Sequence, residues 1–197
     1  MKIGVVSDTH VPDRAVALHP ALLSELRRNK VDLILHAGDI STAGVLQELE
    51  TIAPVKAVSG NRDLLFGSKL DKTLSFDVNG VKLVLTHGHL NFLTYWWDKI
   101  QYMSTGYRRE RIVDRLALAF PQAKIILFGH THRAENLWIN GQLFFNPGST
   151  SIGDLWVHIC SYGIIEIDES GRVTSQIIPL RGFELVKRRW TKLEEEG

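Results

Sequence analysis

Short apolar runs alternate with amphipathic segments along the first part of the chain. The apolar runs are rich in β-branched residues and are typical of buried strands: Lys2–Ser7, Val31–Gly38 and Pro54–Ser59. The segments between them, Ala15–Asn29 and Thr42–Thr51, predict helices, the second with Ser41 as its N-cap. This alternation of strand and helix builds a parallel sheet with helices on its faces.

Paired strands around tight turns are predicted further along the chain. The hairpins join Thr73–Val78 to Val81–Thr86, Glu135–Ile139 to Gln142–Asn146, and Tyr162–Asp168 to Arg172–Leu180. The first two turns are Asn-Gly, the strongest short hairpin signal. Lys124–Phe128 is a further buried strand, and Leu90–Phe120 is a long, largely helical segment with a break near Gly106.

These elements predict an α/β fold in which two β-sheets pack face to face with helices outside. The chain shows no linker or low-complexity segment, so residues 1–197 are expected to form one domain, with a helical, aromatic-rich insertion at about residues 90–120. The charged tail, Lys187–Gly197, is expected to fray or to pack only through Trp190 and Leu193.

Composition places the chain among soluble globular proteins, since 44% of its residues are hydrophobic and 23% are charged. A formal net charge of +1 does not imply nucleic acid or an anionic membrane as the main partner. The single cysteine, Cys160, excludes an internal disulfide and a cysteine-based zinc site. No signal-peptide pattern and no apolar run of membrane-spanning length is present, so a cytoplasmic location without membrane contact is expected.

Polar side chains follow successive predicted strands at the point where each strand ends. They are Asp8 and His10, then Asp39, Asn61, His87 with His89, and His130 with His132. Ligands bind beyond the carboxyl ends of strands in α/β sheets, so these side chains are expected to converge on one crevice. Each pair spaced by two residues points to one side of an extended chain. His36 is instead expected to be a core histidine, and His19 and His158 are assigned no role.

The chemistry of this set is that of a metal site. Carboxylates, imidazoles and an amide oxygen, without thiolate, suit Mn, Fe, Co, Ni or Zn as divalent ions. One ion does not need so many ligands, while an aspartate can bridge two ions. Paired metals are used for in-line displacement at phosphorus.

The sequence resembles the calcineurin-like metallophosphoesterases through five motifs in that family's order. They are "SDTH" (Ser7–His10), "GD" (Gly38-Asp39), "GN" (Gly60-Asn61), "HGH" (His87–His89) and "GHTH" (Gly129–His132). With "NPGS" at Asn146–Ser149, the chain looks like the small bacterial and archaeal phosphodiesterase branch, which also resembles the retromer scaffold subunit. The resemblance implies a two-sheet β-sandwich flanked by helices, in four layers αββα.

The resemblance also implies two divalent metal ions per chain, with Mn favoured. One ion would be held by Asp8, His10, Asp39 and His132, and the other by Asp39, Asn61, His87 and His130. A hydroxide bridging the two ions would attack phosphorus, with Asp39 and Asn61 at the catalytic centre. His89 is not a primary ligand in this mapping, and it would orient His87 or meet the phosphate.

One position departs from the family pattern. Many members carry a histidine after the asparagine, where it contacts phosphate and can protonate the leaving group, whereas this chain has Arg62. Arginine binds phosphate well but is a poor proton donor. Arg62 is therefore counted among the catalytic residues as a phosphate contact, and the alternative is that it turns outward or pairs with Asp63.

The resemblance favours a metal-dependent phosphoesterase, and a phosphodiesterase over a phosphomonoesterase, acting on a small phosphate ester. The alternative is a non-catalytic interaction scaffold of the same fold. The complete ligand set favours the enzyme, whereas the aromatic segment from Tyr95 to Tyr107 supports an interface. That segment can equally pack on the sheet, cover the site, or form a homo-oligomer contact through residues 90–120.

Overall fold

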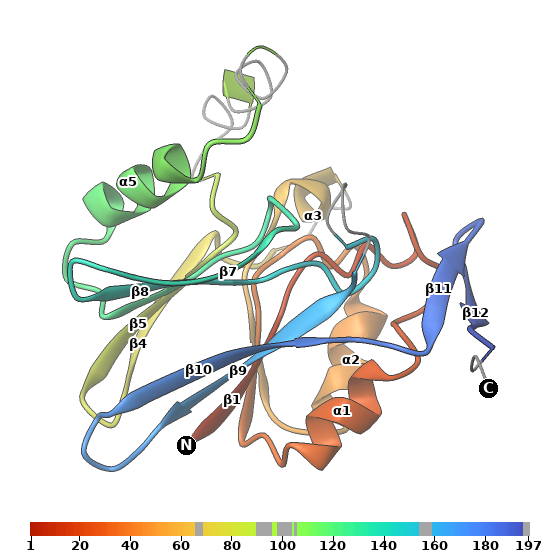
Figure 1. The fold of residues 1–197 in the computed structure, drawn as a ribbon, viewed down its shortest axis with the longest axis horizontal. Helices are drawn as coiled ribbons and strands as arrows, with labels where there is room; N and C mark the ends of the chain where they lie inside the picture. Colours follow the sequence, from red (N-terminus) through yellow and green to blue (C-terminus); the bar gives the residue numbers. More distant parts are fainter. Residues whose placement is uncertain (66–68, 90–95, 98–103, 105, 154–158, 195–197) are drawn as a thin grey trace.

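Two five-stranded sheets stack face to face in the computed structural model, which describes residues 1–65, 69–89, 96–97, 104, 106–153 and 159–194 (Figure 1). The first sheet has the order β10 (Val173–Pro179), β9 (Ser161–Ile167), β1 (Lys2–Val6), β2 (Leu33–His36), β3 (Val55–Ala57). The second has the order β4 (Thr73–Val78), β5 (Val81–Thr86), β6 (Ile125–Leu127), β8 (Gln142–Pro147), β7 (Ala134–Ile139).

Helices cover the outer faces of both sheets, which gives the four layers αββα that the sequence predicts. Helices α1 (Leu22–Arg28) and α2 (Ala43–Glu50) lie on the first sheet, and α5 (Arg109–Ala119) lies on the second (Figure 1). The short helix α3 (Asn61–Leu65) follows β3. Among the described residues, none of the helices has the length and apolar character needed to cross a membrane.

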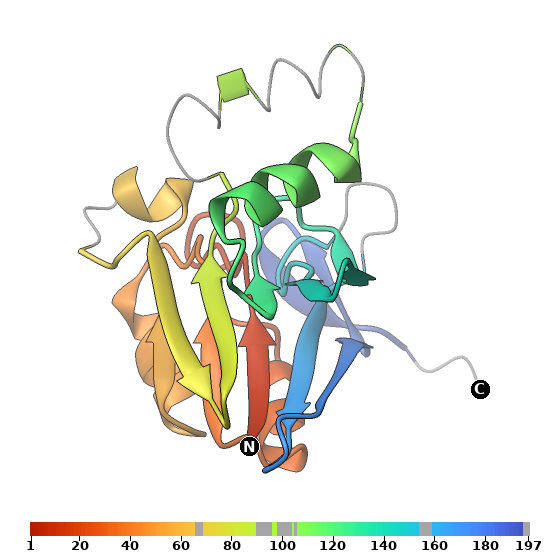
Figure 2. The ribbon, with the colours of Figure 1, turned by 90° about the vertical axis from the view of Figure 1, so that its left-hand side faces the viewer.

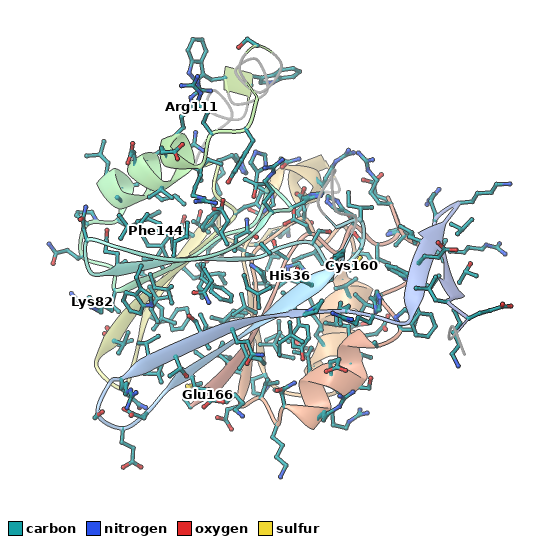
Figure 3. All side chains as sticks on the ribbon, viewed as in Figure 1. His36, Lys82, Arg111, Phe144, Cys160 and Glu166 are labelled. Carbon is teal, nitrogen blue, oxygen red and sulfur yellow. The ribbon has the colours of Figure 1, made fainter. Side chains whose placement is uncertain are left out.

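Strand alternation divides the core into the layers between these elements. In β1, Val5 belongs to the apolar cluster between the sheets, whereas Val6 belongs to the cluster under α1 and α2. In β2, Leu35 and Ile34 divide in the same way. A third cluster, containing Phe144 of β8, lies between the second sheet and α5 (Figure 3). Each large apolar side chain contributes roughly 1.5–3 kcal/mol by such burial, so both faces of each sheet are fixed.

The first predicted helix is shorter than its leucine spacing indicated. Helix α1 begins at Leu22 rather than near Ala15. Pro20 disfavours helical backbone at the residue before it, and Nδ1 of His19 accepts the backbone N–H of Ala21 at 3.2 Å. The chain therefore enters the helix only after Pro20.

The predicted N-cap of the second helix is wrong. Helix α2 has Thr42 at its N-cap, without a side-chain cap bond. Ser41 has a left-handed φ of 74°, and its backbone N–H donates to Asp63 Oδ1 at 2.7 Å. A longer-range contact thus determines the backbone at Ser41.

The predicted helical segment Leu90–Phe120 is described only in part. Residues 90–95, 98–103 and 105 lie outside the described residues, and α5 forms the remainder. Gly106 has a left-handed φ of 73°, and the predicted break near it stays a prediction because most residues before it lie outside the described residues. Trp96 and Trp97 are exposed.

The described part of the charged tail, residues 187–194, forms part of a hairpin, and residues 195–197 lie outside the described residues. Strands β11 (Phe183–Val186) and β12 (Arg189–Lys192) pair with each other and dock on the segment before α1. Trp190 Nε1 donates to the carbonyl of Ala17 at 2.9 Å, and its ring centroid lies 4.6 Å from that of His19. Trp190 packs as expected, but it does so as part of a strand.

We expect the free energy of unfolding to depend on pH through His19, whose ring is packed against this hairpin. Burial lowers the pKa of His19 from 6.5 to about 4. The unfolded chain therefore binds the proton more readily, so His19 stabilises the fold above pH 6.5 and this contribution is lost as the pH falls towards 4. The loss is on the order of 2 kcal/mol.

Urea unfolding of wild type and His19→Asn between pH 7.5 and 4 measures this loss. Asparagine can keep the acceptor for Ala21 but removes the titrating ring. The variant should start less stable and lose less stability over this range. Equal pH slopes in the two proteins would contradict the assignment to His19.

Candidate metal centre

The carboxyl ends of parallel strands in both sheets reach the same rim of the molecule. Strand β1 is parallel to β2, β2 is parallel to β3, and β5 is parallel to β6. The arrowheads of β1 (red) and β5 (yellow-green) point to one rim (Figure 2). The loops that follow these strands carry the predicted ligands, which the structure brings together.

One group of donors consists of Asp8, His10 and His132. Nε2 of His10 lies 3.1 Å from Nε2 of His132, which in turn lies 3.3 Å from Asp8 Oδ1. Only one of two facing imidazole nitrogens can carry the proton between them. Asp8 Oδ1 is also buried without a hydrogen-bond partner among the described residues. A shared cation accounts for both features.

A second group forms around Asn61. Its Oδ1 lies 3.2 Å from Nε2 of His87 and 3.3 Å from Nδ1 of His130. Nδ1 of His87 faces the Ala37 carbonyl oxygen at 2.7 Å and donates to it, which leaves Nε2 as the ligand atom. The arrangement matches a metal-binding histidine whose other nitrogen is held by the backbone.

Asp39 lies between the two groups. Its Oδ2 is 3.8 Å from Nε2 of His10, and its Oδ1 is 3.6 Å from Nε2 of His87. The two oxygens of one carboxylate thus face different donor groups. The residues present fit a pair of divalent ions with Asp39 between them.

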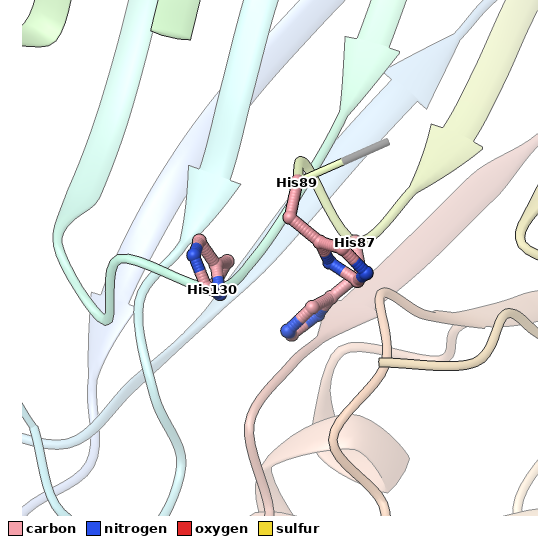
Figure 4. Close-up of side chains that lie close together, drawn as sticks. All are labelled: His87, His89 and His130. Carbon is pink, nitrogen blue, oxygen red and sulfur yellow. The ribbon is translucent and has the colours of Figure 1, made fainter. Parts of the chain in front are cut away.

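His89 lies beside the second group. Its ring centroid is 5.4 Å from that of His87 and 5.6 Å from that of His130 (Figure 4). The three imidazoles come from the loops after β5 and β6. Whether His89 orients His87 or meets phosphate stays a prediction.

The charges of the buried groups depend on one another. Burial alone raises the pKa values of Asp8 and Asp39, but the neighbouring imidazoles, His132 for Asp8 and His87 for Asp39, outweigh it and keep both below their ordinary values. Burial lowers the pKa of His87, but the Asp39 carboxylate reverses this and raises the pKa to about 9. The carboxylates are therefore ionised, and a metal ion would take the place of the His87 proton.

The backbone around the centre is constrained at the ligands themselves. Five of the predicted ligands have left-handed φ values between 50° and 71°: Asp8, His10, Asp39, His130 and His132. Such backbone is uncommon for residues other than glycine, and it clusters at functional sites. A Cβ on Gly60 would lie 2.2 Å from Asp39 Oδ1, and one on Gly129 would lie 1.9 Å from Ser7 Oγ. These two glycines let the loops approach the carboxylates.

Asp63 is a supporting residue whose role the sequence analysis missed. Its Oδ1 accepts the backbone N–H groups of Ile40 at 2.8 Å and Ser41 at 2.7 Å, and its Oδ2 accepts that of Gly60 at 2.7 Å. The contact to Gly60 is the reciprocal half of a capping box and is readable from local spacing. The contacts to Ile40 and Ser41 join the loop of Asp39 to the loop of Asn61.

Two serines of the loop after β8 support Asp8 from behind. The hydroxyls of Ser149 and Ser151 donate to the Asp8 carbonyl oxygen at 2.8 and 2.9 Å. The run of small polar residues at 149–151, just after the buried strand β8, could have indicated this supporting role. It was used in the sequence analysis only as a family motif.

His36 behaves as the expected core histidine. Its Nδ1 accepts the backbone N–H of Gly38 at 3.2 Å, and its Nε2 lies 3.2 Å from Thr9 Oγ1 (Figure 3). His19 contacts the C-terminal hairpin, and His158 lies outside the described residues.

Arg62 does not pair with Asp63, whose oxygens are taken by backbone groups. Its Nη1 lies 3.3 Å from Asp13 Oδ2 instead. Its backbone N–H donates to Asp39 Oδ1 at 2.8 Å, so the residue is adjacent to the centre. Contact with phosphate stays a prediction.

Comparison with known proteins identifies the family. The model of the calcineurin-like phosphoesterase superfamily domain matches residues 1–170. The chain belongs to this superfamily. A probable metallophosphoesterase of Methanothermobacter thermautotrophicus is 34% identical over 152 residues, covering 77% of this chain and 78% of the relative. A phosphodiesterase of Methanocaldococcus jannaschii is 24% identical over 161 residues, covering 75% and 83%.

Solved structures similar to this calcineurin-like phosphoesterase domain include Vps29, a protein named for vacuolar protein sorting. The Vps29 protein of Entamoeba histolytica has a TM-score of 0.67 at 25% identity, covering 92% of this chain and all of its own. An archaeal phosphodiesterase structure has a TM-score of 0.56 at 21% identity, covering 90% of this chain and 100% of its own. The fold is therefore that of metallophosphoesterases and of Vps29.

We expect Asp63→Asn to loosen the junction between the two ligand loops. An amide replaces one acceptor oxygen by a donor that faces a backbone N–H, which costs about 1–3 kcal/mol of unfolding free energy. Urea unfolding of the metal-free protein measures this cost. Asp71→Asn, an exposed aspartate on the following loop, is the matched control. A variant as stable as the control would show that the Asp63 contacts carry no stability.

Proposed function

We propose that this chain is a dinuclear metal-dependent phosphodiesterase that hydrolyses a small phosphate ester. The observation that carries the proposal is the position of Asp39, with one oxygen towards His10 and the other towards His87. The donor set has oxygen and imidazole ligands and suits borderline divalent ions, with Mn favoured.

Two donor groups would hold the ions. Asp8, His10, Asp39 and His132 would hold one, and Asp39, Asn61, His87 and His130 the other. When bound, paired divalent ions supply a nucleophile from water at neutral pH and neutralise charge on the phosphoryl oxygens. The protein contributes fixed geometry, because backbone groups hold the ligands, as at Nδ1 of His87 and the carbonyl of Asp8.

A diester substrate is favoured over a monoester by two considerations. A relative of similar length carries the name phosphodiesterase. Arg62, a cation beside the centre, is paired with Asp13, so it offers less to a second substrate charge than an unpaired arginine would. Arg62 would bind a phosphoryl oxygen without donating a proton to the leaving group.

A non-catalytic scaffold is the second candidate. The likeness to Vps29 and the exposed Trp96 and Trp97 favour it. The left-handed backbone at five predicted ligands favours the enzyme, because such backbone is costly and an interaction surface elsewhere does not require it.

We expect the purified protein to bind two divalent ions per chain and to hydrolyse bis(4-nitrophenyl) phosphate. Asp39→Asn should lower the rate at least about 100-fold, the range that the loss of one electrostatic stabiliser costs. Metal analysis and steady-state kinetics measure both effects. Asp77→Asn is the matched control, because Asp77 lies at the turn of the β4–β5 hairpin, at the other end from His87. One ion per chain at saturation, or a fully active Asp39→Asn variant, would contradict the dinuclear proposal.

We also expect the rate to depend steeply on the leaving group. General-acid help contributes about 10²–10⁴-fold, and Arg62 cannot supply it. Aryl methyl phosphates with graded phenol pKa values should therefore show a steep negative slope of log kcat/KM, and Arg62→His should flatten it. Identical slopes in wild type and Arg62→His would show that position 62 does not face the leaving group.

A further inference from the structure

Asp13 and Arg62 form an ion pair that joins two loops of the candidate centre. Arg62 directly follows Asn61, and Asp13 lies three residues after His10. Nη1 of Arg62 is 3.3 Å from Asp13 Oδ2, with side chains 32% and 24% exposed. The pair is therefore partly buried at the rim of the centre.

Local backbone contacts hold both residues near the predicted ligands. The Arg62 N–H donates to Asp39 Oδ1 at 2.8 Å. The turn that carries Asp13 is closed by the Arg14 N–H, which donates to the His10 carbonyl at 2.7 Å. Asp13 and Arg62 consequently meet because the turn after His10 and the start of α3, at Asn61, converge.

The contact leaves Arg62 with capacity for an anion. The pair joins Nη1 to Asp13 Oδ2 and leaves the Arg62 side chain 32% exposed, whereas a guanidinium can bind a carboxylate or phosphate through two nitrogens. Asp13 Oδ2 also lies 3.9 Å from Arg14 Nε, so the carboxylate faces two cations. A partly exposed pair of this kind contributes little energy and can rearrange when substrate arrives.

We propose that Asp13 sets the charge preference of the site by holding Arg62 in this pair. The inference rests on the proposed phosphoesterase function and adds a specificity-determining residue that acts through Arg62. With the pair intact, Asp13 offsets the charge of Arg62, and this suits a diester because a diester carries one negative charge. A monoester carries two charges above a second pKa near 6, and its second charge would compete with Asp13 for Arg62.

Removal of the Asp13 charge should release Arg62 for the second charge of a monoester. At about pH 8, Asp13→Asn should raise kcat/KM for 4-nitrophenyl phosphate about fivefold, the upper range for a partly exposed pair. The value for bis(4-nitrophenyl) phosphate should change less than about twofold. The change in the monoester to diester ratio is the readout that a merely structural role would not move.

Two further variants separate this role from general effects of charge. Glu166→Gln also removes one acid from a surface ion pair, with Lys2, at the edge of the molecule (Figure 3). It should leave the ratio unchanged. In an Arg62→Gln background, Asp13→Asn should no longer change the ratio, because Asp13 acts through Arg62. The same ratio change in both backgrounds would overturn the proposal.

Measurements of anion binding test the role of Asp13 even if neither ester is hydrolysed. Titration calorimetry of the Mn-loaded protein with inorganic phosphate and with dimethyl phosphate compares a largely doubly charged anion with a singly charged one. Asp13→Asn should tighten phosphate about fivefold and leave dimethyl phosphate within about twofold. Equal shifts for both anions, or none, would overturn the role of Asp13. Absence of hydrolysis together with the expected binding shift would reject the phosphodiesterase activity alone.

Discussion

The burial of two ionised carboxylates where the sheets meet is the constraint on which the site depends. An unpaired buried charge costs several kcal/mol, so Asp8 and Asp39 need partners on every side. Asp8 Oδ2 accepts the Ser7 hydroxyl at 2.6 Å and the His130 N–H at 3.1 Å, whereas its Oδ1 faces the imidazoles. Neutral donors therefore hold the outer side of the carboxylate, and the inner side is left for cations.

This division explains the unusual backbone of the loops. To place N–H groups behind the carboxylates, the chain turns sharply after each strand, which gives the left-handed φ values at the predicted ligands. Glycine is needed where a loop passes directly over a carboxylate, as Gly60 does at Asp39. The strain is offset by contacts such as those of Asp63, so ligand geometry and loop stability depend on the same hydrogen bonds.

The succession of strands and helices along the chain and the polar residues at the strand ends were predictable, because each is written in a short stretch of sequence. The four layers were expected from the family resemblance. A buried apolar run followed by Asp or His predicts a strand with a ligand at its end from neighbouring residues alone, as at Asp8 and His130. Contacts between distant segments were not predictable. Asp63 binds Ile40 and Ser41 across the fold, and the C-terminal hairpin is defined by Trp190 meeting His19. No periodicity encodes these contacts, because they depend on how the loops stack.

Relatives of this fold are named both as phosphoesterases and for vacuolar protein sorting, so fold alone cannot distinguish the two functions. The interior donors and the residues at the rim would have different roles in the proposed function. In the proposed function, interior donors such as Asp39 and His87 would decide whether ions are held. Rim residues such as Arg62 and Asp13 would decide which phosphate is bound. The Asp13–Arg62 pair joins the His10 and Asn61 loops beside a predicted ligand, so it belongs to the rim. Under the proposed function, the Asp13–Arg62 pair beside the interior donors would favour a singly charged phosphate.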